Sequence, residues 1–388
     1  MKNYIWFGLI CLLLLPGCYD EAALTPSGAD KDWADSLELE YPLVKEYYEK
    51  YGVGLLTRYD LNRDLLYNMT TSNIQSDSWN TLRVDRMERT TEVDSALAFL
   101  DNTLLQYFTD EDFIRTYFPT RILVGREVFL DNSRNSVCPI CLESDARVSS
   151  SGINSLHSIF SRISFAVSCK LNTIYFSDEN YYNYKMDNLY MFICYLFERN
   201  DLYSLFGTDF YLPSMENCYG RPLTGDEDSW LGLGVYVEEG GSPDDRYTDK
   251  YWYWNKGFVS TKWIHAIPAA GEHKDQIELQ AQYGITDVYV FPDKQRDVRM
   301  LINQLLFVTR DVWDSYPEVV KNRFALLMAK FDEWGIDIRA VNPVIADVFP
   351  RNEMTGRIND TLHNDLYLKR LRKYGISRWT SLKRNDYE

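Results

Sequence analysis

A short apolar run at the N-terminus constrains this chain more than any other feature. Residues 5–15 are almost all apolar and follow a single basic residue, Lys2. Because a helix needs about 20 apolar residues to span a bilayer, this run is typical of a signal-peptide core and not of an anchor helix. We therefore expect residues 1–17 to be removed. The remainder, which holds no longer apolar run, is expected to fold outside the bilayer.

The run ends in Leu15-Pro16-Gly17-Cys18, which resembles a bacterial lipobox apart from Pro16, where a small or aliphatic residue is usual. Cleavage would make Cys18 the new N-terminus, and its acyl chains would together give the stable anchoring that one chain does not. Residues 18–31 are rich in small and acidic residues and are expected to form a flexible tether. We therefore expect lipid anchoring through Cys18 to the outer membrane, at the cell surface. The alternative is an ordinary secretory signal in which Cys18 has no role.

The charge and the histidine content exclude several functions. Asp plus Glu number 57 against 41 Lys plus Arg, which gives a net charge of −16. Such a surface repels polyphosphate, so no nucleic-acid partner is expected. A hydrophobic fraction of 45% is ordinary for a globular protein and excludes a wholly disordered chain. Histidine is scarce, which limits imidazole catalysis and zinc binding; the four residues are His157, His265, His273 and His363.

Cysteine spacing does not predict a metal site. Five cysteines remain beside Cys11 and Cys18, so at least one thiol is unpaired. Cys138 and Cys141 form one C-x-x-C motif, whereas a zinc site needs a second pair or two nearby His residues. Polar residues precede the motif, and a loop with two thiols or a local disulfide is expected there.

The body of the chain predicts a mixed α+β fold. Residues 32–218 combine short strands with helices and are expected to form an N-terminal lobe. Apolar stripes at helical spacing, or short apolar runs bounded by turn residues, define each element. The expected helices are residues 42–51, 92–107 and 187–199, and the expected strands are residues 53–59, 121–125, 163–169 and 173–176.

Residues 219–250 differ in composition from the rest of the chain. They are rich in Gly, Pro and acidic residues, which predicts a long loop region at a lobe boundary. Residues 251–388 are expected to form a mainly helical C-terminal lobe. Basic residues gather in its last thirty positions; they form either a solvated helix face or a surface for a partner.

Three capping signals define helices in this C-terminal part. Asp293 is expected to cap a helix that begins at Lys294. Ser315 and Glu318 have the spacing of a capping box. Gly335 stands where a left-handed C-cap belongs.

The common catalytic motifs are missing from the sequence. It contains no H-E-x-x-H, G-x-S-x-G, S-x-x-K or P-loop pattern. His265 and His273 are separated by Pro268 and Gly271, so they cannot form a metal-binding pair on one helix. Paired carboxylates for glycoside hydrolysis stay open, because 57 acidic residues give many pairs. We expect no metal ligands and no cofactor.

An aromatic cluster at residues 251–254 has two interpretations. In a strand, successive rings would alternate between the two faces. Exposed, Trp252, Tyr253 and Trp254 would bind a ligand by stacking on sugars or contacting peptides. Buried, the same rings would be two layers of core.

Short fragments spread over residues 51–340 carry a resemblance to a known family. They are Tyr51–Asp60 with the Tyr67-Asn68 pair, Phe118-Pro119 before Leu123-Val124, Gly257–Ser260, and Trp334–Asp337. In this order, and together with the motif at Cys18, they resemble zinc-binding metallopeptidase lipoproteins.

The resemblance implies a zincin-like α+β fold and a gene neighbourhood for a Sus-type nutrient importer. The implied partners are a TonB-dependent transporter and its lid lipoprotein. The H-E-x-x-H helix of the family should fall at Leu189–Glu198, where this chain has no His. The later acidic segment of the family should lie near Lys294, where Asp297 is closely followed by the cation Arg299. No metal ligand or general base is therefore carried over.

These observations favour a pseudoenzyme. The expected function is a non-catalytic outer-membrane surface lipoprotein, an accessory binding or scaffold subunit of a Sus-type TonB-dependent uptake complex for a peptide or glycan. One alternative is an active hydrolase, a peptidase or glycosidase whose site the sequence does not reveal. A buried carboxylate cluster or Cys–His pair with shifted pKa would favour it. The other alternative is an envelope structural or cell-surface interaction protein.

Overall fold

The computed structural model describes residues 33–65, 82–87, 90–131, 153–220, 252–260, 262–265 and 287–350. The signal peptide, Cys18, the tether, the C-x-x-C motif, nearly all of the 219–250 loop region and the basic C-terminal segment lie outside the described residues. The chain forms two units, residues 1–36 and residues 37–388. Of the first unit only the 3₁₀ helix η1 (Trp33–Ser36) is described. All that follows concerns the second unit.

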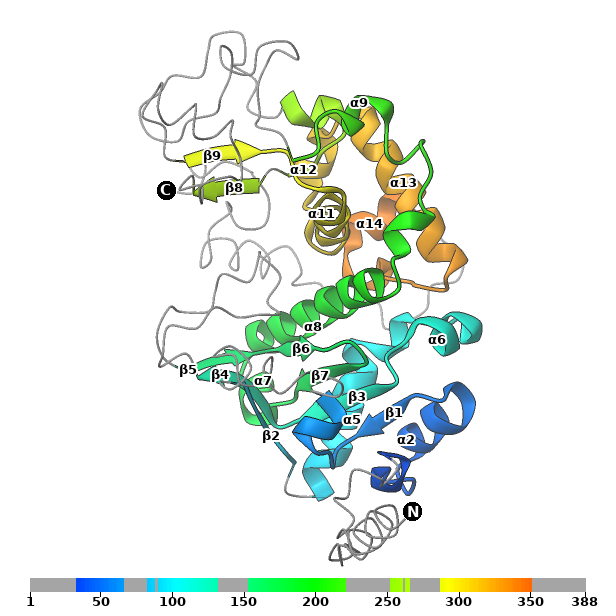
Figure 1. Cartoon of the computed structure of the whole chain (residues 1–388), viewed down its shortest axis with the longest axis vertical. Helices are drawn as coiled ribbons and strands as arrows, with labels where there is room; N and C mark the ends of the chain where they lie inside the picture. Colours follow the sequence, from blue (N-terminus) through cyan, green and yellow to red (C-terminus); the bar gives the residue numbers. More distant parts are fainter. Residues whose placement is uncertain are drawn as a thin grey trace, which may run out of the picture. The chain divides into compact units, whose positions relative to one another are not determined.

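The second unit has a mixed α+β fold, as the sequence predicts. Its central sheet has four strands in the order β1-β3-β7-β6 (Figure 1). β1 (Gly54–Leu56), β3 (Arg121–Gly125) and β7 (Ser164–Ser168) are parallel, and β6 (Ser158–Phe160) is antiparallel to β7. All five residues of β3 and of β7 are buried. Burial on both faces explains why β3 has a continuous apolar run instead of an alternating pattern.

A second, antiparallel sheet continues from the first. It has the order β2-β4-β5, with β2 (Leu82–Asp85), β4 (Glu127–Asp131) and β5 (Ile153–Leu156). A two-stranded sheet joins β8 (Lys262–His265) to β9 (Asp287–Val290). The chain passes from β3 to β4 at Arg126 and from β5 to β6 at His157. Each of these single residues therefore lies at a switch between two sheets.

The expected N-terminal helices are present. α2 (Pro42–Glu46) continues as the π-helix η2 (Tyr47–Tyr51), which Gly52 ends in the left-handed conformation. The helix expected at residues 92–107 is α5 (Thr90–Thr103) followed by the 3₁₀ helix η4 (Leu105–Tyr107). Further short helices complete this part of the chain: η3 (Leu61–Leu65), α6 (Glu111–Tyr117), η6 (Leu202–Leu205) and α9 (Pro213–Glu216).

The long helix α8 (Asp178–Arg199) lies along the central sheet (Figure 1). It begins nine residues earlier than the predicted residue 187, and the Ser177 side chain caps it by accepting from the Asn180 amide. The first half of α8 is polar, so it lacks the apolar residues at helical spacing from which a helix is predicted. The strand predicted at residues 173–176 is wrong, because this segment contains α7 (Leu171–Ile174). There the Ile174 amide donates to the Lys170 carbonyl, and this local helical turn overrides the β-propensity of the segment.

The described C-terminal segment is helical after β9. Asp293 caps α11 (Lys294–Phe307) as predicted, since its carboxylate accepts from the Arg296 amide. The capping box predicted at Ser315 is wrong: this residue ends α12 and its hydroxyl donates to the Asp311 carbonyl. Pro317 is the N-cap of the next helix. The remaining elements are α12 (Arg310–Ser315), α13 (Glu318–Glu333), η9 (Arg339–Val341) and α14 (Pro343–Val348).

Gly335, just after α13, joins distant parts of the chain. Its φ of +63° confirms the predicted left-handed position, and a Cβ there would lie 2.5 Å from the Asp110 nitrogen. Its carbonyl accepts from the Thr109 amide at 2.8 Å, and Phe108 forms a β-bridge with Ile336. The turn therefore ties the end of α13 to the start of α6.

One continuous core runs through the unit and is rich in aromatic rings. Phe192 of α8 lies 5.0 Å from Phe165 of β7 between ring centroids, and Phe197 lies 5.7 Å from Trp334. α8 therefore contributes to the packing of both the sheet and the C-terminal helices. Among the described residues, no helix combines the length and apolar character that a membrane span requires.

Candidate functional site

The segment Leu189–Glu198, where the resemblance implies the metal-binding motif, lies in the second half of α8. The side chains of Leu189, Phe192 and Ile193 are fully buried, with 0% exposure. Glu198 is half exposed and pairs with Arg299 at 3.5 Å. The described residues contain no group of three or more His, Cys, Asp or Glu side chains that could hold a metal ion. This helix face forms core.

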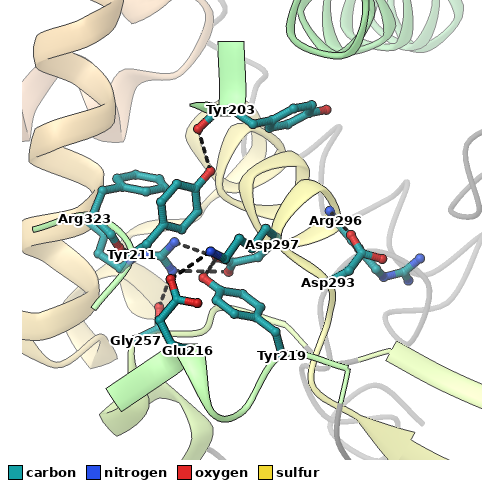
Figure 2. A network of polar contacts seen from close by, with 11 residues as sticks. Tyr203, Tyr211, Glu216, Tyr219, Gly257, Asp293, Arg296, Asp297 and Arg323 are labelled. Atoms are coloured by element: carbon teal, nitrogen blue, oxygen red, sulfur yellow. Dashed lines mark hydrogen bonds and ion pairs between the residues drawn. The ribbon is translucent and has the colours of Figure 1, made fainter. Parts of the chain in front are cut away.

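Asp297, from the second position that the resemblance singles out, forms a buried ion pair (Figure 2). Its carboxylate accepts from the two terminal nitrogens of Arg323 at 3.2 and 2.6 Å, and both residues are 1% exposed. The Tyr219 hydroxyl donates to the same carboxylate at 3.2 Å. Burial raises the pKa of Asp297, while the Arg323 guanidinium and the Tyr219 hydroxyl act against that shift.

All three side-chain nitrogens of Arg323 donate hydrogen bonds. Its Nε donates to the Phe210 carbonyl at 2.9 Å and its Nη1 to the Gly257 carbonyl at 2.7 Å. The guanidinium carbon lies 4.5 Å from the Phe210 ring centroid. Gly257 has φ +105°, which favours glycine and presents its carbonyl here. Sequence patterns alone do not identify Arg323 as part of a polar network, because it stands inside the apolar stripe of α13 between Val320 and Phe324.

The rim of this network is also paired. Lys294 lies 2.8 Å from Glu216, and 5.1 and 5.6 Å from the ring centroids of Tyr211 and Tyr219. Burial raises the pKa of both tyrosines, so they stay protonated and act as donors. Asp297 is a buried carboxylate with a raised pKa, the kind of group that would favour a hydrolase. However, it is saturated by Arg323 and Tyr219, so the arrangement stabilises the fold and offers no free group to a substrate.

The aromatic cluster at residues 252–254 does not form a strand. It belongs to the 3₁₀ helix η8 (Trp252–Lys256). Tyr253 is 3% and Trp254 4% exposed, and the Trp254 ring lies 4.7 Å from that of Tyr316. The interpretation of these two rings as exposed stacking platforms is therefore wrong, because the tight helix turns both into the core. The side chain of Trp252 lies outside the described residues.

A second polar region joins the β5–β6 connection to α8. His157 Nδ1 lies 2.5 Å from an oxygen of Asp187, and the two side chains are 24% and 10% exposed. The imidazole packs on Tyr184, with ring centroids 3.9 Å apart and planes inclined by 32°. The sequence did not reveal this pair, because the two residues stand thirty positions apart and belong to no spacing motif.

A second charged pair lies near Tyr184. Lys170 lies 2.7 Å from Glu127. Burial, followed by the nearby charges of Glu127, Cys169 and Asp187, raises the pKa of Tyr184 to about 12. Tyr184 is therefore the common neighbour of these groups. We call His157, Asp187, Tyr184, Glu127 and Lys170 the His157 cluster.

The His157 cluster lies at the carboxyl ends of parallel strands. The Cys169 amide, just after β7, donates to the carbonyl of Gly125, the last residue of β3. The Ser168 amide donates to the His157 carbonyl at 2.8 Å. The cluster therefore lies where the two central parallel strands, β3 and β7, end.

Two residues next to the cluster in the sequence have buried polar atoms without a hydrogen-bond partner. The side-chain oxygen and nitrogen of Asn188 are buried without a hydrogen-bond partner, and so is the Ser158 hydroxyl. Asn188 is 0% and Ser158 7% exposed. They are the chain neighbours of Asp187 and His157, and Asn188 lies one helical turn after Tyr184. Such atoms are costly to leave unpaired in a folded protein, by about 1–3 kcal/mol each.

The chemistry of the pair follows from the hydrogen bond. When His157 is neutral and Nδ1–H donates to Asp187, Nε2 is left as an acceptor. Nε2 has no hydrogen-bond partner within the described part of the chain. This nitrogen can thus accept a hydrogen bond from a hydroxyl. No protein-family model, curated protein or solved structure matches this chain.

Proposed function

We propose that this chain is a non-catalytic, lipid-anchored binding or scaffold subunit of a Sus-type TonB-dependent uptake complex at the outer-membrane surface. In this proposal it is a zincin-like lipoprotein that has lost its metal motif. The observation that carries the proposal is the burial of apolar side chains along Leu189–Glu198.

A catalytic zinc site needs three protein ligands and an open position for water. Leu189, Phe192 and Ile193 are each 0% exposed, so this face of α8 is filled by core packing. The acidic position at Asp297 is saturated by Arg323. Both positions where the resemblance implies metal chemistry thus contribute to stability, which supports a role in contacts instead of catalysis.

The anchoring part of the proposal rests on Cys18. A lipid tether confines the body to one membrane face, which raises its effective concentration toward any partner there. Metabolic labelling with a fatty-acid analogue is expected to mark the wild type and to leave Cys18→Ala unlabelled. Equal labelling of both proteins would contradict lipidation.

The complex is tested by affinity purification from mild-detergent extracts of the native membrane, followed by mass spectrometry. We expect a TonB-dependent transporter and its lid lipoprotein to co-purify with the wild type, and far less with Cys18→Ala. Recovery of the protein alone, at native expression and low salt, would rule out the accessory-subunit role.

Elemental analysis is expected to find no stoichiometric zinc. About one zinc per chain, with chelator-sensitive proteolysis, would refute the pseudoenzyme part.

A further inference from the structure

We propose that Arg299, on α11, forms a binding site for a carboxylate group of a ligand. This inference rests on the binding role proposed above and gives that role a class of ligand. A peptide carries such a carboxylate at its C-terminus, and a uronic-acid sugar carries one on its ring. The proposal is therefore about the shared chemistry of these two sources.

Arg299 is a largely buried arginine that donates no hydrogen bond within the described residues. Its side chain is 13% exposed, and its ion pair with Glu198 is long, at 3.5 Å. Arg323 and Arg339 are even less exposed, yet each of them donates from all three side-chain nitrogens. A guanidinium has five N–H groups that can donate. Those of Arg299 are left for a ligand or for water.

The side-chain nitrogens of Arg299 also reach solvent. None of them is among the fully buried polar atoms that lack a partner, whereas the hydroxyl of its neighbour Tyr203 is. Since these nitrogens have no hydrogen bond, each of them must retain accessible surface. Packing holds the rest of the side chain, so less conformational freedom is lost when a ligand binds. Arg299 therefore presents its donors in a restrained position that a ligand can reach from solution.

One face of α8 lies next to Arg299. Tyr190, Cys194 and Glu198 stand four residues apart, so they share a face of this helix. The ion pair of Glu198 with Arg299 shows that this face is turned toward α11, which packs against α8. Tyr190 is 1% and Cys194 0% exposed. Such dry surroundings strengthen a hydrogen bond between a guanidinium and a carboxylate.

Arg299 remains a cation in this position. Burial lowers its pKa, but the neighbouring Tyr190, Tyr203, Cys194 and Glu198 outweigh burial, and the pKa is raised overall. The charge needed to bind an anion is therefore present at every pH at which the protein is folded.

The surrounding charge selects a carboxylate over a phosphate. Glu198 lies 3.5 Å from Arg299, and the net charge of the chain is −16, so a doubly charged anion is repelled. A carboxylate has a single charge and two oxygens that match the fork of the guanidinium. It has to displace Glu198, whose side chain is 44% exposed and can turn into solvent. Glu198 is thus an internal competitor of the ligand.

The test is isothermal titration calorimetry of the full chain in detergent. The probes are N-acetyl-trialanine and methyl glucuronoside, which carry one carboxylate each. Their neutral counterparts are N-acetyl-trialanine amide and methyl glucoside. We expect at least one carboxylate probe to bind, and its neutral counterpart to bind at least roughly tenfold more weakly. The probe that binds identifies the source of the carboxylate as peptide or sugar.

Two variants have opposite expected effects on this binding. Arg299→Gln should weaken it at least roughly tenfold, because the charged fork is lost. Glu198→Gln should strengthen it several-fold, because the competing carboxylate is removed. Arg310→Gln removes a surface arginine that pairs with Asp347 and should leave binding unchanged. Thermal unfolding midpoints check that the variants fold, and Glu198→Gln, at a half-exposed position, keeps the inference testable if Arg299→Gln does not.

Three outcomes would overturn the site: neither carboxylate probe binds, the neutral counterparts bind equally well, or Glu198→Gln fails to strengthen binding. Co-purification with the transporter separates this inference from the proposed function. A complex that forms although the chain binds no carboxylate sinks the site alone. Carboxylate binding by a chain that purifies alone sinks the accessory role alone.

Discussion

Two polar regions of the described residues, around Asp297 and around His157, differ in how completely their groups are paired. Asp297 and Arg323 are both 1% exposed, and the guanidinium uses its nitrogens on the carboxylate and two carbonyls. His157 and Asp187 are 24% and 10% exposed, and their sequence neighbours Ser158 and Asn188 have buried polar atoms that lack partners. A saturated network holds elements together and has nothing left to offer a ligand. The unsaturated one has a free imidazole nitrogen and lies at the carboxyl ends of strands, so it is the region that can serve function.

Arg323→Met should break the saturated region with the largest effect. It leaves the Asp297 carboxylate buried without its cation, which should lower the free energy of unfolding by about 3–5 kcal/mol. Urea denaturation followed by circular dichroism measures the change. Arg310→Met is the matched control, because Arg310 pairs with Asp347 at the surface and its loss should cost less than about 1 kcal/mol. Equal effects of the two substitutions would show that the comparison is wrong.

Tyr219→Phe should have the next largest effect. It removes the hydroxyl that donates to Asp297 at 3.2 Å while keeping the ring. A hydrogen bond to a buried carboxylate contributes about 1.5 kcal/mol, and we expect a loss of that order. Tyr175→Phe removes the same hydroxyl from a ring that is 58% exposed, and its effect on stability should be close to zero. The same urea titration compares the two variants.

Asp187→Asn should affect stability less than either change in the saturated region. The amide of Asn keeps an oxygen that can accept from the His157 imidazole, so we expect a loss of only about 1 kcal/mol. A loss as large as that of Arg323→Met would place this pair among the structural networks. A small loss of stability would sharpen the contrast between the regions.

Tyr184→Phe should give the smallest effect on stability at neutral pH, because the ionisation of Tyr184 acts only in alkali. The folded-state pKa of Tyr184 is raised from 10.0 to about 12. Its contribution to stability is therefore complete below pH 10 and is lost as the pH rises through about 12. The variant should lose less stability than the wild type over this interval and match it in pH dependence at neutral pH. Thermal unfolding midpoints measured from pH 8 upward would detect the difference, and identical alkaline profiles would contradict it.

The sequence predicts the elements whose own residues carry the signal. The apolar run Arg121–Gly125 identifies β3, and Asp293 identifies the start of α11. The first half of α8 was not predicted as helix, because Asn183, Lys185 and Asp187 interrupt its apolar period. All three residues are nevertheless buried in the fold. Tertiary packing, which the local pattern does not encode, decides that part of the helix.

The site is harder to predict than the fold. His157 meets Asp187 only because β6 and α8 pack together, and Arg323 meets Asp297 only because α13 packs near α11. Neither pair has a spacing rule that could be read from the chain. A signal did exist for Arg323: a charged residue inside an apolar stripe needs a buried partner. The interpretation of residues 252–254 as a ligand surface was wrong because composition alone does not distinguish aromatic rings in a buried turn from rings on the surface.

The turn at Gly335 also bears on how the chain reaches its fold. It pairs Gly335 with Thr109, which is 226 positions away in the sequence. A contact this distant has a high loop-closure cost and is expected to form late. During synthesis, Tyr107, Phe108 and Thr109 emerge long before the residues that pair with them. The segment that begins α6 must therefore wait for the end of α13, and a chain truncated before Gly335 would leave this edge without its partner.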